Sequence, residues 1–480
     1  MYHTAIFDVY DASATKELFA YMDRLTAGAK CMYNVTNFHI RQLMTGLKKD
    51  PSERTPNEQS VIDKVGKYLP LINEGIAERN RKRAASGKKL TKLFAMPTVE
   101  KSFVGKNFLV AMFAMDDDPD YRAMYSQAAQ NAVKECVGAW KSFFALKKAG
   151  DIDAKIPRYK KKEHASVTFN NQGCRIENGM LRLPGTKIRF DVGSFPHCDD
   201  KLIEIRIVPY FGHYQIHILT DDLAEEPEKK DPCEPRNAMM IDLGVDNFAT
   251  ITDSIGRTPI AVKGGYLKSV NQNWNRMNAM LKSILMKGHD PKTYHPENTK
   301  RMNAISARRD RIFRDMFYKI SHFICTTAVS RGIDMIIVGR NTGWKQNANM
   351  GHRNNQTFVQ IPYAQFINLL KVTALKYGIE VFEQEESYTS RSSFIDDDPI
   401  PTYGNPESPY INLSGRRVKR GLYRTADGTL INADVNGSLN IGRKYDPWMF
   451  ESMSSGERKH YASSTAVVGY RALHPESKGR

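Results

Sequence analysis

Three acidic side chains, far apart in the chain, lie in stretches whose patterns could bring carboxylates together. Asp242 lies near the end of an apolar run, MMIDLG (239–244), that is typical of a buried strand followed by a tight turn. A carboxylate on such a strand is costly unless it has a partner or a chemical role. Candidate partners lie in the later stretches EVFEQEESYTS (380–390) and NADVNGSLNI (432–441).

Carboxylates gathered at one edge of a sheet could hold divalent cations. Cleavage of a phosphodiester by two metal ions needs a few carboxylates around ions about 4 Å apart. One ion activates water and the other stabilises the leaving oxygen, and Mg²⁺ or Mn²⁺ suits such hard oxygen ligands. We therefore hypothesise that Asp242, Glu386 and Asp434 converge on Mg²⁺ or Mn²⁺ and cut nucleic acid.

Each acid also has a structural explanation when it is taken alone. Asp242 could serve the turn that follows it or cap a helix. Glu386 could lie on a solvent-facing strand edge. Asp434 could cap a helix, with Asn436 as a second candidate for that role. Only the three acids together, in this order along the chain, favour catalysis over these explanations.

The size and charge of the chain indicate several domains and a basic surface. A chain of 480 residues is too long for one ordinary core, so two or three domains are expected. The chain holds 70 lysines and arginines against 53 acids, a formal net charge of +17, and its isoelectric point is near 9.4. This balance favours a polyanionic partner, although a basic protein without such a partner would share it.

The cysteines and the apolar segments exclude several classes of protein. The six cysteines lie far apart and form no Cys-x-x-Cys pair, which predicts neither a zinc ribbon nor a disulfide framework. The first residues, MYHTAIFDVYDAS, lack the basic and apolar regions of a secretory signal. No apolar run approaches the roughly 20 residues of a membrane span. We therefore expect a cytoplasmic protein with no membrane partner.

The acids must be positioned by a sheet and its helices in the last half of the chain. Residues 237–453 predict a three-stranded meander followed by alternating helices and parallel strands, which is an α/β layout. Within this region we expect a helical hairpin at 267–331 and a cysteine-free lid at 388–431. The polar, serine-rich residues 454–480 predict a flexible tail.

The first half of the chain predicts two further domains. Residues 1–13 hold a strand, and residues 14–150 predict a mostly helical domain. Residues 151–236 contain short runs of period-two alternation separated by glycines, which predicts antiparallel strands in a small β-barrel. The strand within 1–13 is expected to be the first strand of that barrel.

Two basic clusters are candidates for contact with nucleic-acid phosphates. Pro157 and Tyr159 lie inside the first cluster, which indicates an ordered basic edge rather than a floppy tail. The second cluster lies in the lid and could be a surface hairpin that also holds a strand near the acids. The candidate residues are Lys160, Lys161, Lys162, Arg416, Arg417, Lys419 and Arg420.

The residues around the acids resemble one known family. IDLGVDNFATITD (241–253) resembles the first RuvC motif of TnpB proteins, the transposon-encoded RNA-guided endonucleases ancestral to type V CRISPR effectors. DVNGSLNIGRK (434–444) resembles their third RuvC motif, and YTSRSSF (388–394) resembles the stretch that leads into their zinc ribbon. Other stretches similar to this family are MYNVTNFHIRQ (32–42), AWKSFFALKK (139–148) and IPRYKKK (156–162).

The chain departs from the family pattern at the second acid. Many members carry that acid on the strand equivalent to MIIVGRN (335–341), where this chain has Gly339 and Arg340, which cannot ligate a metal. In some TnpB subgroups, and in their eukaryotic Fanzor relatives, a glutamate lies three residues before the Thr of Thr-Ser. The resemblance to them implies Glu386. Glu385 is the nearest competitor, although strand alternation would point it the other way.

The second departure concerns the zinc ribbon of the family. No cysteine lies between Ser390 and Asn432, so no zinc is expected and the lid must become ordered without metal. In other respects the resemblance implies the family's multidomain architecture. This is an α/β RNase H-like (RuvC) nuclease domain, an antiparallel wedge β-barrel and a helical recognition domain.

The resemblance also implies partners and leaves alternatives open. Family members bind a guide RNA, here an omega RNA-like molecule or a CRISPR RNA, which pairs with one strand of double-stranded target DNA beside a short flanking motif. We expect a monomer or homodimer in a prokaryotic cytoplasm, associated with the nucleoid. The alternatives are a nuclease-inactive, RNA-guided repressor, against which three intact acids argue, and an RNase H-type transposase, which also uses three acids.

Overall fold

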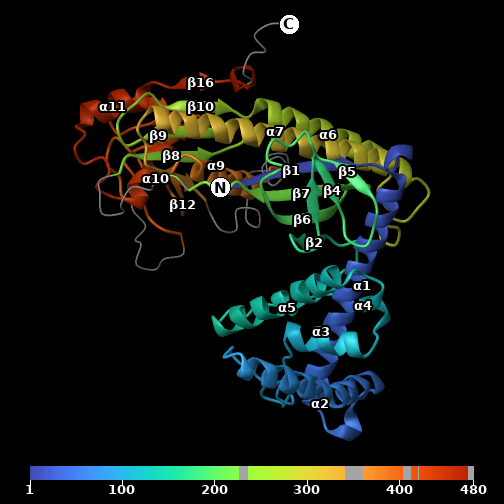
Figure 1. Cartoon of the computed structure of the whole chain (residues 1–480). Helices are drawn as coiled ribbons and strands as arrows, with labels where there is room; N and C mark the ends of the chain where they lie inside the picture. The colour runs from blue at the N-terminus through green and yellow to red at the C-terminus, as the bar shows by residue number, and fades with distance from the viewer. Residues whose placement is uncertain (226, 228–235, 341–359, 404–411, 420, 474–480) are drawn as a thin grey trace. The chain divides into compact units, whose positions relative to one another are not determined.

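The chain forms two compact units, Met1–Ala224 and Glu225–Arg480, and each is described by itself (Figure 1). The computed structural model describes residues 1–225, 227, 236–340, 360–403, 412–419 and 421–473. Among these residues, no helix is both long enough and apolar enough to cross a lipid bilayer.

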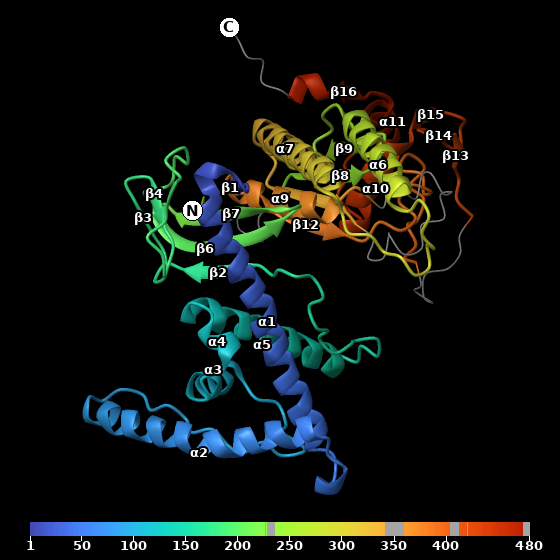
Figure 2. The ribbon, with the colours of Figure 1, turned by 90° about the vertical axis from the view of Figure 1, so that its right-hand side faces the viewer.

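Helix α1 connects the strands of the first unit to its other helices (Figure 2). Its buried side chains recur at steps of three and four, as expected for a helix packed along one face. Helix α2 begins at a capping box, in which Thr55 and Glu58 each accept a hydrogen bond from the other's backbone amide. The helices of this unit are α1 (Lys16–Gly46), α2 (Pro56–Ala85), α3 (Lys106–Met115), α4 (Pro119–Arg122) and α5 (Ser126–Lys148).

The segment that follows α5 is fastened along α1 by two side-chain amides. Asn34 donates to the carbonyl of Lys160 at 3.0 Å and accepts from its amide at 2.8 Å. Asn37 donates to the carbonyl of Pro157 at 3.1 Å and accepts from the indole of Trp140 at 2.9 Å. These bonds fix the extended backbone between Pro157 and Lys160 against the helix.

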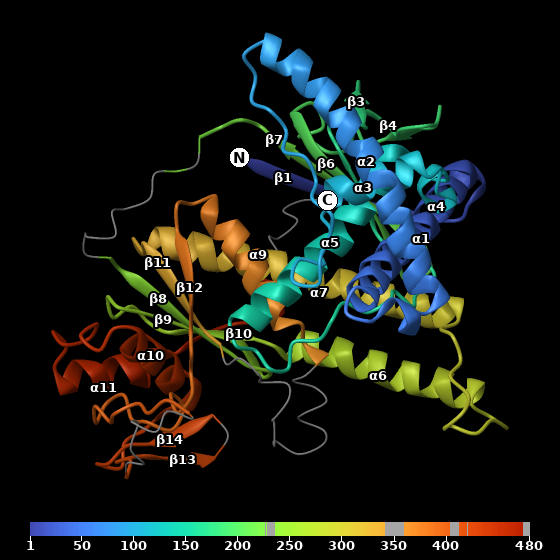
Figure 3. The ribbon, with the colours of Figure 1, turned by 90° about the horizontal axis from the view of Figure 1, so that it is seen from below.

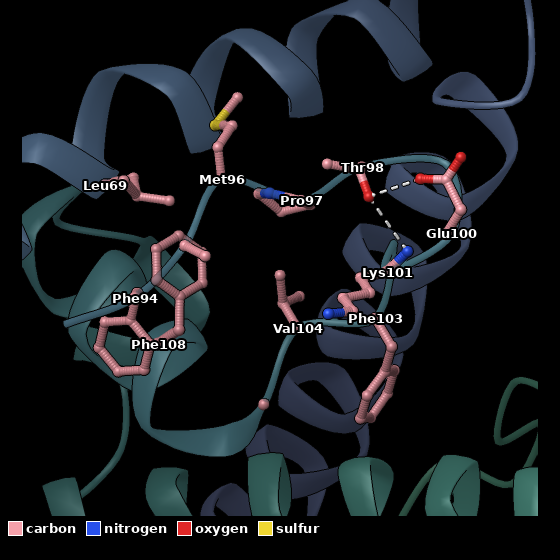
Figure 4. Close-up of a pocket in the computed structure, with 12 residues that line it drawn as sticks. Leu69, Phe94, Met96, Pro97, Thr98, Glu100, Lys101, Phe103, Val104 and Phe108 are labelled. Carbon is pink, nitrogen blue, oxygen red and sulfur yellow. Dashed lines mark hydrogen bonds between the residues drawn. The ribbon is translucent and has the colours of Figure 1, made fainter. Parts of the chain in front are cut away.

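An apolar cavity of about 670 Å³ lies beside the segment that joins α2 to α3. Asn73 of α2 holds that segment, because it donates to the carbonyl of Phe94 and accepts from its amide, both at 2.8 Å. Figure 4 shows Phe94 and Phe108 together on one side of the cavity, near Leu69.

The strands of the first unit form two antiparallel sheets. The four-stranded sheet has the order β1-β7-β6-β2, and a separate three-stranded sheet has the order β3-β4-β5. Asn178 and Gly179 join β3 to β4 with φ of 50° and 71°, the left-handed backbone of a type I′ hairpin. The strands are β1 (Tyr2–Val9), β2 (Val167–Asn170), β3 (Arg175–Glu177), β4 (Met180–Arg182), β5 (Arg189–Asp191), β6 (Lys201–Tyr210) and β7 (His213–Asp221).

The strand pairing corrects the prediction of a barrel. Strand β1 joins the strands of residues 151–236 through β7, with Tyr2 opposite Asp221 and Val9 opposite Tyr214. Closure would require β1 and β2 to pair, but they are the two edges of an open sheet among the described strands. The period-two alternation correctly predicts antiparallel strands. Whether the sheet closes into a barrel depends on whether its two edge strands pair, which the alternation does not show.

The second unit is built on one mixed sheet with the order β12-β11-β8-β9-β10-β16. Strands β8, β9 and β10 form an antiparallel meander, β11 runs parallel to β8, and β12 runs parallel to β11. The strands are β8 (Ala238–Leu243), β9 (Asn247–Asp253), β10 (Ile260–Lys263), β11 (Met335–Gly339), β12 (Glu380–Gln384) and β16 (Ala466–Val468).

Helices cover both faces of this sheet (Figure 3). Met239 and Ile241 of β8 pack into one core with helices α7 (Lys300–Ser330) and α9 (Tyr363–Leu375). Ala238 and Met240 pack into the other core with helix α10 (Ala433–Tyr445). Because side chains alternate along a strand, Asp242 lies on the face that α10 covers.

The remaining elements of this unit are a helical hairpin and a small lid. Helix α6 (Gly265–Leu285) packs on α7, where the Trp274 indole donates to Ser306 Oγ at 3.0 Å. The lid holds an antiparallel sheet of β13 (Arg416–Lys419), β14 (Leu422–Arg424) and β15 (Leu430–Asn432).

The structure corrects the prediction of a flexible tail for residues 454–473. Helix α11 (Ser455–Ser463) packs into the core beneath α10, β16 pairs in parallel with β10, and Leu473 is buried. Although α11 is mostly polar, its residues Tyr461 and Ala462 form a buried face that the overall composition did not indicate. Residues 474–480 lie outside the described part of the chain.

We predict that Tyr461→Phe destabilises the second unit by about 1–3 kcal/mol, the usual effect of leaving a buried polar group unsatisfied. The Tyr461 hydroxyl donates to the carbonyl of Asp253 and accepts from its amide, both at 2.7 Å. Urea denaturation would measure the change, with Tyr445→Phe on the partly exposed end of α10 as the control. Equal stability of the two variants would contradict the contact.

Candidate active site

Asp242 lies where the end of β8 meets helix α10 (Ala433–Tyr445). The helix can approach this carboxylate because residue 437 is a glycine. A Cβ atom on Gly437 would lie 2.9 Å from Asp242 Oδ2, closer than real Cβ contacts allow. Ser438 holds the same turn of the helix against the sheet, donating to the carbonyls of Met240 and Thr250 with distances of 3.1 Å.

Asp434 occupies the first turn of α10 without capping it. The cap is Asn432, whose side chain accepts from the amides of Asp434 at 2.9 Å and Val435 at 3.4 Å. The Asp434 carboxylate is therefore available at the helix N-terminus, where negative charge is favoured. It accepts from Asn247 Nδ2 at 2.7 Å and from the Arg417 guanidinium at 3.3 Å.

Glu386 follows the end of β12 and lies against Gly339 at the end of β11. A Cβ atom on Gly339 would collide with Glu386 Oε2 and would lie 2.5 Å from Ile441 Cδ1. The glycine thus leaves the space that the Glu386 carboxyl occupies.

Glu385 is directed to different partners. Lys444 Nζ lies 2.5 Å from Glu385 Oε2, and the amide of Ser387 donates to Glu385 Oε1 at 2.7 Å. Burial opposes ionisation of Glu385, but the bonds from Lys444 and Ser387 outweigh it and lower the pKa of this carboxyl. Of the two neighbouring glutamates, Glu386 is the one that interacts electrostatically with Asp242.

The electrostatics of the cluster disfavour several ionised carboxylates at once. Burial raises the pKa of Asp242 to about 7, with further repulsion from Asp434 and a smaller opposing effect of Arg417. Burial also raises the pKa of Glu386 well above its usual range, and Asp242 and Glu385 add to this shift. Asp242 thus interacts unfavourably with both Asp434 and Glu386, although the ligand atoms of the three acids do not all lie within 4.8 Å of one another.

The polar residues of the stretch DVNGSLN fasten α10 to the loop that follows β12. Asn436 donates to the carbonyl of Ser392 at 2.8 Å and accepts from the amide of Phe394 at 2.9 Å. Asn440, one turn later, donates to the carbonyls of Thr389 at 2.9 Å and Ser392 at 2.7 Å. Asn436 is thus a buried connector and not a cap.

Two aspartates organise the lid, in which the sequence has no cysteine. Asp398 accepts from the amides of Ser393 at 2.8 Å and Ser414 at 3.1 Å. Asp396 accepts from the Ser393 hydroxyl at 2.5 Å and from the amide of Ala426 at 3.0 Å. These bonds join three separate stretches of the lid.

Asp397, which lies between these two aspartates in the sequence, connects the lid to helices α10 and α11. Its carboxylate pairs with Arg443 of α10 at 2.6 Å and with Arg458 of α11 at 3.1 Å. The ion pair between Asp397 and Arg443 therefore connects the lid to α10, the helix that carries Asp434.

The predicted phosphate-binding residues have different surroundings. Lys160 is partly buried, since its ammonium pairs with Glu135 at 2.7 Å and lies 4.5 Å from the centre of the Tyr33 ring. Arg417 contacts Asp434, as described above. The remaining described candidates are exposed and stay predictions: Lys161, Lys162, Arg416 and Lys419. Arg420 lies outside the described residues.

Sequence reasoning missed Asn247 and Lys263. Asn247 lies within the stretch 241–253, but its residue type does not distinguish a strand start from a support for Asp434. Lys263 Nζ donates to Asn247 Oδ1 at 2.8 Å and holds that amide in place. Only the antiparallel pairing of β9 and β10 brings these two residues together.

We predict that the metal-free protein loses stability as pH rises from about 4 to about 7, and that Asp242→Asn removes part of this loss. The pKa of Asp242 is raised in the folded state from 3.8 to about 7, so the folded chain binds this proton more tightly than the unfolded chain. At pH 8 the variant should melt higher, by about 2–4 °C for each kcal/mol of repulsion removed.

Thermal melting in a chelator at pH 5 and pH 8 would measure this difference. Asp246→Asn is the control, because Asp246 is exposed and lies outside the acidic cluster. A variant that melts lower than the natural chain at pH 8 would contradict the repulsion.

Two family models match adjoining parts of the chain. Residues 222–345 match OrfB_IS605, described as a probable transposase, and residues 363–441 match the Cas12f1-like TNB domain. No curated protein matches the chain.

Solved structures of Cas12f proteins are also similar over most of the chain. One, a Cas12f1–sgRNA–target DNA complex, has a TM-score of 0.43 and 12% identity, covering 92% of this chain and 98% of that one. Another, a CRISPR-Cas12f ternary complex, has a TM-score of 0.31 and 13% identity, covering 89% and 81%. Because both TM-scores are below 0.5, we draw no conclusion about this chain from the two structures.

The two matched regions contain the motifs around Asp242, Glu386 and Asp434. The order of the matches along the chain is also the order of the motifs that resemble TnpB proteins. The chain is therefore similar to OrfB_IS605 proteins over residues 222–345 and to Cas12f1-like TNB domains over residues 363–441.

Proposed function

We propose that this chain is an RNA-guided endonuclease that cuts DNA by metal-dependent hydrolysis of phosphodiester bonds. The observation that carries the proposal is that the buried Asp242 carboxyl interacts electrostatically with Asp434 at the start of α10 and with Glu386 after β12. The strand order, a three-stranded antiparallel meander followed by two parallel strands, supports assigning the second unit to the RNase H-like (RuvC) class.

The donor chemistry of these acids suits a divalent cation, although their ligand atoms do not all lie within 4.8 Å of one another in this structure. The donors are carboxylate oxygens, which hard cations prefer, and their mutual repulsion would be relieved by positive charge. Asp242, Glu386 and Asp434 would hold Mg²⁺ or Mn²⁺. When bound, such ions supply an activated water and stabilise the charge on the leaving oxygen.

Other residues of the chain position these acids. Asn247, itself held by Lys263, donates to Asp434 and orients its carboxylate. The Tyr363 hydroxyl donates to the carbonyl of Gly244 at 2.9 Å, which supports the turn that follows Asp242. Arg417 places a guanidinium group at 3.3 Å from Asp434, where it could also contact a phosphate of the substrate.

Guide RNA and target DNA are the proposed partners because of the family and the charge. A formal net charge of +17 suits a chain that must contact many phosphates. The exposed Lys161, Lys162, Arg416 and Lys419 are proposed phosphate contacts.

We predict that Asp242→Ala, Glu386→Ala and Asp434→Ala each reduce cleavage of guide-matched DNA by about 10²–10³-fold or more, as is typical when one electrostatic stabiliser is lost. Binding of the co-purifying RNA should change little, because none of the three acids would contact it favourably. Cleavage of labelled DNA in Mg²⁺ or Mn²⁺ would measure the effect.

The matched control is Glu385→Gln, which removes the neighbouring charge but leaves Glu386 in place. Mg²⁺ should raise the melting temperature of the natural chain at pH 8 more than that of Asp242→Asn, since a ligand stabilises the state that binds it. Cutting that survives Asp242→Ala would disprove the assignment.

We predict that Gly339→Ala lowers cleavage by about 10–100-fold, the effect expected when a catalytic group is displaced by about 1 Å. The added methyl group would push the Glu386 carboxyl from its position. Stability should fall by about 1–3 kcal/mol, because the methyl group would also press on Ile441, whose side chain is fully buried. Gly265→Ala is the control, since no atom within 4 Å opposes a Cβ there.

A second candidate function is that of an RNase H-type transposase, which the description of the OrfB_IS605 family favours. The same acids would then serve strand transfer as well as cutting. Incubation with labelled transposon ends separates the two functions. Strand joining without added RNA would favour the transposase, whereas RNA-directed cutting without joining favours the endonuclease.

A further inference from the structure

The small sheet of the first unit carries a row of three arginines in register. Arg175 of β3 lies opposite Arg182 of β4, and Arg182 lies opposite Arg189 of β5. Residues directly opposite each other on antiparallel strands point to the same face. The three guanidinium groups therefore share one face, and all three residues are exposed.

The other face of this sheet is apolar and faces the core. Leu181 is buried, and Ile176 and Phe190 pack against the same core. The sheet is thus amphipathic, and its outward face is not needed to bury apolar surface.

The arginine row has no evident stabilising role in the fold. Like charges directly opposite each other destabilise a sheet. The three guanidinium groups make no ion pair or hydrogen bond with any residue that the structure describes. By contrast, Arg206 on β6 pairs with Glu204 at 2.7 Å. The acids of this face, Glu177 and Asp191, lie at the far end of the same strands, opposite Met180.

An open cavity of about 550 Å³ adjoins the row. Arg175, Arg182 and Lys187 line it with positive charge, and Tyr125 contributes a ring that is 39% exposed. A charged row beside an exposed aromatic ring combines phosphate contact with a surface on which a base can stack.

We propose that this face binds single-stranded nucleic acid, with phosphates on the arginine row and an unpaired base on Tyr125. Two strand spacings separate Arg175 from Arg189 by roughly 10 Å. One strand of a duplex carries a charge about every 3.4 Å of the helix axis, and the spacing is wider in an extended single strand, so about two to three phosphates fit along the row. The planar guanidinium fork suits phosphate oxygens. The inference rests on the proposed function only in taking nucleic acid as the source of the phosphates.

The test compares full-length R175Q/R182Q/R189Q with the natural chain in binding a fluorescent 12-nucleotide RNA and the matching DNA. Both proteins carry Asp242→Ala, and the buffer contains a chelator, so cleavage does not enter. The slope of log affinity against log salt should fall by about 2, because each lost contact with a single strand removes about 0.7. Tyr125→Leu should weaken binding about 5- to 100-fold with little change of slope.

Two further variants separate charge from folding. R175K/R182K/R189K keeps the charges and should keep most of the slope. E177Q/D191N changes the far end of the same face and should not reduce it. The proposal is overturned if the glutamine variant keeps the natural slope, or if the lysine variant loses as much slope as the glutamine variant. Either result would leave the cleavage tests of Asp242 untouched, since those tests measure a different unit and a different reaction.

Discussion

Helix α10 must lie close to the sheet, because its first turn carries Asp434 and its flank meets Asp242. That approach depends on Gly437, where a Cβ would come within 2.9 Å of the Asp242 carboxylate. Ser438 compensates for the buried polar surface by bonding to two strand carbonyls at 3.1 Å. A close contact between a polar helix and a sheet edge is stable only when its buried donors and acceptors are paired, as those of Asn436, Ser438 and Asn440 are here.

The acids themselves oppose this packing, since burial and mutual repulsion raise the pKa of Asp242 and Glu386. Neighbouring hydrogen bonds and ion pairs hold them together. Asn436 and Asn440 join α10 to the loop that carries Glu386, and Asp397 joins the lid to Arg443 of the same helix. Acidic side chains and backbone amides thus organise a segment whose sequence contains no cysteine.

Each unit of the chain therefore holds like charges side by side. In one unit they are the carboxylates around Asp242, and in the other they are Arg175, Arg182 and Arg189. Both arrangements lower stability in the absence of a ligand of opposite charge. We propose a divalent cation as the ligand of the first arrangement and a nucleic-acid strand as the ligand of the second. Such local conflicts with stability are expected where a protein binds its ligands.

Residue types and their periodicity were enough to predict which acids are candidates and which stretches form strands and helices. They did not predict whether the strands in residues 151–236 close into a barrel, or how residues 454–473 fold, since pairing between distant edges has no local signal. The contact of Glu385 with Lys444, 59 residues later, and the position of Glu386 beside Gly339 are known only from the folded chain. Strand alternation predicts that Glu385 and Glu386 point in opposite directions. It does not predict which of them faces Asp242, because their partners lie on other strands and helices.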